Sequence, residues 1–86
     1  ILMNPPTITV ELEYRNQTYD VMIPMAVTTN RLKDLLREAL VLKKVVLPEQ
    51  FDLVLKNKPF LLAPSAFLSE YPVGNGDQLE VVARVE

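Results

Sequence analysis

The chain has 86 residues, 49% hydrophobic and 23% charged, an ordinary balance for one globular domain. A net charge of −2 gives no basic field for nucleic acid, and no apolar run approaches the roughly 18 residues of a membrane-spanning helix. The absence of cysteine and histidine removes thiol chemistry and the commonest general base, so the composition favours a binding domain in a reducing cytoplasm over an enzyme.

Two segments near the N-terminus alternate between apolar and polar residues. TITVELEY over residues 7–14 and TYDVMIP over residues 18–24 each have the two-residue period of a half-buried strand. The intervening Arg15-Asn16-Gln17 is able to turn the chain, so the two segments predict a hairpin that ends at Pro24. Its inward side chains are expected to be Ile8, Val10, Leu12, Tyr14, Tyr19, Val21 and Ile23.

One amphipathic helix is predicted over about Thr29 to Leu42. Thr28 and Thr29 are suitable N-cap residues, and Pro48 prevents a long continuation. The apolar residues that recur at helical spacing are Leu32, Leu35, Leu36, Ala39 and Leu40. Of these, we expect Leu32, Leu36 and Ala39 to be buried against the sheet.

The second half of the chain predicts shorter elements. Residues 51–55 read as a strand, residues 59–62 as a short edge strand, and residues 79–85 as a final strand. A hairpin-like reversal is expected at 74–77. One helix covering one face of a mixed four- to five-stranded sheet is an α+β, β-grasp architecture. The expected organisation is a flexible lead over residues 1–6 and one domain over 7–86.

Three short motifs carry a resemblance to a known family. Leu68-Ser69-Glu70-Tyr71 is close to a turn of ubiquitin, and the chain resembles ubiquitin from Thr7 to Val85. TYDVMIP before a helix, and the ending YPVGNGDQL over residues 71–79, are similar to patterns of the bacterial YukD/EsaB proteins. Those ubiquitin-like proteins are encoded with type VII, WXG- or ESX-like, secretion systems.

The resemblance implies a cytoplasmic accessory or regulatory protein that binds a protein component of the secretion apparatus. It implies neither catalysis nor a cofactor, and no nucleic acid or direct membrane insertion. The protein is then expected in the cytoplasm, or at the inner face of the membrane through its partner, with its oligomeric state left open. In the resembling turn of ubiquitin the tyrosine is structural, and the same is expected of Tyr71.

The ending Ala83-Arg84-Val85-Glu86 bears on conjugation. Ubiquitin-type modifiers need a C-terminal Gly-Gly, so a chain that stops at Glu86 is expected to act as a docking protein instead. Two alternatives stay open. The chain is a ubiquitin-like domain of a larger secretion-system membrane protein, or it is a modifier or sulfur carrier with a Gly-Gly tail beyond Glu86. The sequence is compatible both with a natural start at Met3 and with a piece of a longer chain.

Val54 and Val82 are the candidate protein-binding residues. Ubiquitin builds its apolar recognition patch from the matching places in its third and last strands. Single exposed valines are also common in strands, and the polar Arg15 and Asn16 stand where ubiquitin has its third patch residue. That departure argues against binding to ubiquitin receptors.

No catalytic, cofactor or metal site is predicted. Ser65 and Ser69 lack a partner that would activate them, and the Gly74–Asp77 segment reads as a turn rather than a phosphate loop. The acidic residues Glu11, Glu13 and Asp20 fall on the solvent side of two neighbouring strands, where charge normally serves solubility and register.

Overall fold

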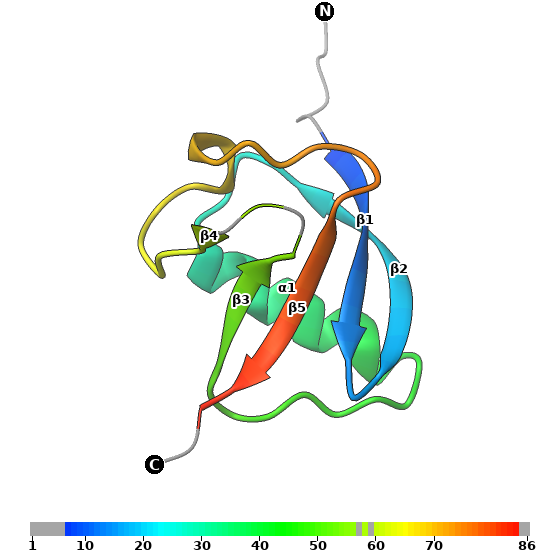
Figure 1. Ribbon diagram of the computed structural model, residues 1–86. Helices are drawn as coiled ribbons and strands as arrows, with labels where there is room; N and C mark the ends of the chain where they lie inside the picture. The colour runs from blue at the N-terminus through cyan, green and yellow to red at the C-terminus, as the bar shows by residue number, and fades with distance from the viewer. Residues whose placement is uncertain (1–6, 57, 59, 85–86) are drawn as a thin grey trace, which may run out of the picture.

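The computed structural model describes residues 7–56, 58 and 60–84. In chain order the elements are β1 (Thr7–Tyr14), β2 (Gln17–Pro24), α1 (Thr29–Val41), β3 (Phe51–Leu55), β4 (Phe60–Leu61), a 3-10 turn (Leu68–Glu70) and β5 (Gln78–Ala83). The strands form one five-stranded sheet in the order β2-β1-β5-β3-β4, and α1 crosses one face of it (Figure 1). The expected lead over residues 1–6 lies outside the described residues, as do Val85 and Glu86.

β1 and β2 form the predicted hairpin. They pair antiparallel from Thr7 opposite Pro24 to Tyr14 opposite Gln17. Arg15 and Asn16 make the turn with φ values of 54° and 62°. Two consecutive positive φ values match the right-handed twist of paired strands, which is why two residues suffice to reverse the chain.

Helix α1 is close to its predicted extent. Thr28 is the N-cap, and its side-chain oxygen accepts a hydrogen bond from the backbone N–H of Arg31 at 3.2 Å. Leu32 and Leu36 are buried as expected, whereas Ala39 is only half-buried and Leu40 takes the inward position. Residues 32, 36 and 40 lie four apart and form one ridge along the helix. Ala39 lies to one side of that ridge and is therefore less buried.

The sheet is mixed because β5 lies between the first and third strands. β5 runs parallel to β1 and antiparallel to β3, and its central place gives it neighbours on both sides. This arrangement confirms the predicted β-grasp. The buried apolar residues between the sheet, α1 and the connecting loops are Val10, Leu12, Val21, Ile23, Leu32, Leu36, Leu40, Leu47, Phe51, Leu53, Leu55, Leu62, Leu68, Val73, Leu79 and Val81.

The long connection from β4 to β5 is fixed to the rest of the fold at several points. Leu68 is fully buried, and its N–H donates to the carbonyl of Val27 at 2.8 Å. The 74–77 segment makes the predicted turn, although it does not join two hydrogen-bonded neighbouring strands. It lies against the start of β1 instead: Gly76 N–H donates to the Thr9 carbonyl at 2.9 Å, and Thr9 N–H donates to Asn75 Oδ1 at 2.8 Å.

Tyr71 has the structural role that was expected of it. Its hydroxyl oxygen accepts a hydrogen bond from the N–H of Ala63 at 2.8 Å. Its ring meets that of Phe60 edge to face, with centroids 6.2 Å apart. The tyrosine therefore holds the loop after β4 against the turn that precedes β5.

A Tyr71→Phe substitution tests this role. It keeps the ring contact but removes the acceptor for the Ala63 N–H, so the free energy of unfolding should fall by about 0.5–1 kcal/mol, measured by denaturant melts. Tyr14→Phe is the matched control because no hydrogen bond of the Tyr14 hydroxyl is found among the described residues, and it should change stability little. Equal losses in the two variants would contradict the role assigned to Tyr71.

Candidate protein-binding surface

The face of the sheet turned away from α1 brings the two candidate valines together. The register of β3 and β5 sets Val54 opposite Glu80 and Val82 opposite Asp52. Leu53 and Val81 beside them point into the core, so both valines point outward. They are diagonal neighbours, roughly 7–8 Å apart for such a pair. Val54 is half-buried and Val82 is 41% exposed.

Leu61 extends this apolar surface and was missed in the sequence. It lies on β4 directly opposite Val54, and its side chain is 60% exposed. We call Val54, Leu61 and Val82 the outer-face patch. The sequence predicted that Leu61 belongs to a short edge strand. It did not show on which face of the sheet the side chain lies, because that depends on the register with β3.

Charged pairs border the outer-face patch. Lys56 Nζ lies 2.8 Å from Glu13 Oε1, and Arg84 Nη2 lies 2.7 Å from Asp52 Oδ1. The hydrogen bond from Arg84 lowers the pKa of Asp52, and the hydrogen bond to Glu13 raises the pKa of Lys56. Both pairs are solvent-exposed and therefore weak, so they shape the charge around the patch more than the stability of the fold.

The acidic residues of β1 and β2 lie on this same face. Glu11 Oε1 accepts a hydrogen bond from Gln78 at 2.9 Å, and Glu13 is held by Lys56. Asp20 lies opposite Glu11 on β2. Within residues 7–56, 58 and 60–84, no group of three or more His, Cys, Asp or Glu side chains is arranged to hold a metal ion.

The hairpin turn lies at the same end of the sheet as Val82. β1 runs parallel to β5 with Glu13 beside Glu80. Two residues further along both strands, the turn at Arg15 therefore reaches the level of Val82. Its Arg15 and Asn16 are exposed and polar. The apolar surface of the outer-face patch therefore extends to Leu61 on β4 and does not include the first turn.

Solved structures place this fold in the class of ubiquitin-like domains. An N-terminal ubiquitin-like domain solved in solution matches with a TM-score of 0.74 and 17% identity, over 96% of this chain and 80% of that one. A chain of the ESX-5 inner membrane complex matches with a TM-score of 0.71 and 19% identity, over 95% of this chain and 22% of that one. A chain of toluene 4-monooxygenase matches with a TM-score of 0.72 and 11% identity, over 92% and 100%. At such identities the likeness is one of fold.

The family is narrower than the fold. The family model described as the WXG100 protein secretion system (Wss) protein YukD matches residues 7–81, and the chain belongs to this family. An uncharacterized protein of Clostridium acetobutylicum is 33% identical over 70 residues, 81% of this chain and 76% of the relative. The protein is thus a ubiquitin-like protein associated with type VII secretion, as the motifs indicated. Among the described residues, no helix is long and apolar enough to span a membrane.

Proposed function

We propose that this protein is an accessory or regulatory factor of its secretion system that binds a protein component through the outer-face patch. The observation that carries the proposal is the grouping of Val54, Leu61 and Val82 on three neighbouring strands of the exposed sheet face. A partner that covers these side chains gains about 25 cal/mol per Å² of apolar surface removed from water. On this proposal the protein acts in the cytoplasm or at the inner face of the membrane, where its partner lies.

The charged side chains around the patch favour a defined way of docking. Glu80 lies beside the apolar side chains, and Glu11 and Asp20 continue the acidic surface across β1 and β2. Asp52 and Glu13 on the same face are paired with Arg84 and Lys56. A partner with an apolar centre and a basic rim would complement this face. Binding is favoured over catalysis because the sequence has no histidine or cysteine.

Deletion and rescue in the native host test the proposed function. Removing the gene should lower the amount of WXG100 proteins in the culture medium, and a plasmid copy of the wild-type gene should restore it. A tagged copy should also co-purify a component of the secretion apparatus after mild cross-linking. Unchanged secretion together with no enriched component would overturn the proposal.

A second candidate is a ubiquitin-like domain within a larger secretion-system protein. It is supported by the match to 22% of a longer chain in the ESX-5 inner membrane complex. The mass of the native protein, measured intact from the host, separates the two. A mass near the 9.8 kDa of this chain favours the small accessory protein, and a much larger mass favours the domain.

A further inference from the structure

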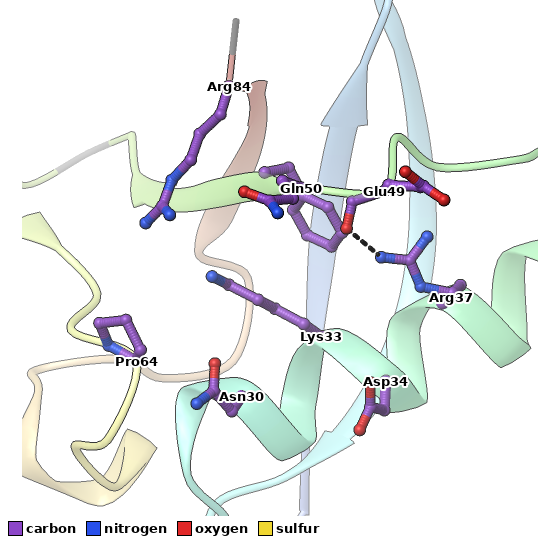
Figure 2. A pocket seen from close by; sticks show the side chains of 9 residues that line it. Asn30, Lys33, Asp34, Arg37, Glu49, Gln50, Pro64 and Arg84 are labelled. Atoms are coloured by element: carbon purple, nitrogen blue, oxygen red, sulfur yellow. Dashed lines mark hydrogen bonds between the residues drawn. The ribbon is translucent and has the colours of Figure 1, made fainter. Parts of the chain in front are cut away.

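A polar groove lies beside α1 and meets the border of the outer-face patch at Arg84. Its volume is about 530 Å³, and it is bounded by the N-terminal half of α1, the start of β3, the loop at Pro64 and the residue after β5, Arg84 (Figure 2). A groove of this size accommodates a short stretch of peptide. Three cationic side chains line it, which are Lys33, Arg37 and Arg84.

Arg37 shapes one wall of the groove and has little capacity left for a ligand. Its guanidinium donates to three consecutive backbone carbonyls, at 3.3 Å to Leu47, 3.0 Å to Pro48 and 3.1 Å to Glu49. It also lies over the ring of Phe51, 5.5 Å from the centroid. These contacts tie the segment between α1 and β3 to the helix.

Lys33 is the cation available for a ligand. Its Nζ lies 5.7 Å from the centroid of the Phe51 ring, and within residues 7–56, 58 and 60–84 it forms no ion pair. The nearby carboxylate of Asp52 is already bonded to Arg84. Lys33 acts on Asp52 only at longer range, where it helps to lower the pKa of that carboxyl group.

Figure 2 shows how the polar side chains are distributed. Lys33 extends into the groove between Asn30 and Gln50, and the guanidinium of Arg84 reaches toward the same space. In this view the two acidic side chains that line the groove, Asp34 and Glu49, lie on the side of Arg37. The part near Lys33 is therefore the positive part.

We propose that this groove binds an acidic peptide segment of a partner protein, with a carboxylate on Lys33 and on Nη1 of Arg84, whose Nε and Nη2 donate to Asp52. The side-chain amides of Asn30 and Gln50 are able to donate to and accept from the peptide backbone. A singly charged carboxylate matches the charge of the Lys33 ammonium, whereas Asp34 and Glu49 would repel a doubly charged phosphate more strongly. The proposal does not depend on the outer-face patch or on a secretion partner.

Titration of the isotope-labelled 86-residue chain by NMR tests the proposal. The probe is a blocked hexaglutamate peptide, and the matched probe is a blocked hexaglutamine peptide. Hexaglutamate should shift the amide signals of residues 30–37, 49–51 and 84, and hexaglutamine should not. Lys33→Met keeps the apolar stem over Phe51 and removes the charge, so the Kd for hexaglutamate should rise by about three- to fivefold, as for one exposed charge pair. Lys43→Met removes an exposed lysine outside the groove and should leave the Kd unchanged.

Three results would overturn the proposal. The first is equal shifts at lysines outside the groove, such as Lys43 and Lys56, which would show nonspecific charge attraction. The second is an equal Kd for wild type and Lys33→Met when both give dispersed, folded spectra. The third is binding of inorganic phosphate to the same residues with no response to hexaglutamate, which would make the groove a site for small anions.

Discussion

Leu36→Ala is expected to lower the free energy of unfolding by about 2–5 kcal/mol, the usual loss for a leucine truncated in a core. Leu36 is 1% exposed and lies midway along the buried ridge of α1, between Leu32 and Leu40. A domain of this size has a total stability of roughly 5–15 kcal/mol, so the loss is a large share. Denaturant melts measure it, and the melting temperature should fall by about 8 °C or more.

Leu42→Ala is the matched control for this truncation. It removes the same atoms at the C-cap of the same helix, where the side chain is 86% exposed. Its effect should stay within about 0.5 kcal/mol, as for other surface sites. If the two substitutions cost the same, the buried ridge of α1 has been assigned to the wrong residues.

Replacing Val54 and Val82 together with lysine is expected to weaken binding to the secretion-system component by at least about tenfold, roughly 1.4 kcal/mol. Each ammonium group would have to be desolvated when the partner covers the outer-face patch. Lysine is a better choice than aspartate because Glu80 and Asp52 lie directly opposite the two positions. Aspartate there would set like charges across the strands and destabilise the sheet. Calorimetric titration against the purified component measures the change.

Met22→Lys provides the control for the double variant. Met22 lies opposite Thr9 on the same face of the sheet, on the edge strand β2, and is 73% exposed. It introduces the same charge away from the patch, so binding should remain close to that of the wild type. A double variant that is folded by circular dichroism and binds normally would place the docking surface elsewhere, with the helix face around Arg31, Asp34 and Glu38 as the next candidate.

The sequence was informative wherever one periodicity held over a whole element. Two-residue alternation identified the inward face of β1 and β2, and helical spacing identified Leu32 and Leu36. Ala39 was assigned wrongly because the positions three and four residues after Leu36 lie on opposite sides of it, and spacing alone does not show which side faces the sheet. The exposed position of Leu61 and the groove beside α1 could not be predicted from the sequence, for another reason. Each depends on residues distant in sequence, such as Lys33 and Arg84, and only the register of the strands and the path of the loops bring these together.

The parallel pairing of β1 with β5 has a consequence for how the chain is made. β5 is the last of the five strands in chain order, yet in the finished sheet it lies between β1 and β3. Until residues 78–83 have emerged, β5 cannot join the β1–β2 hairpin to the β3–β4 pair, and the inner edges of β1 and β3 have no partner strand. Unpaired edges of this kind attract other chains. Synthesis of β5 is therefore the step that covers these two edges and lowers the exposure of the domain to chaperones and proteases.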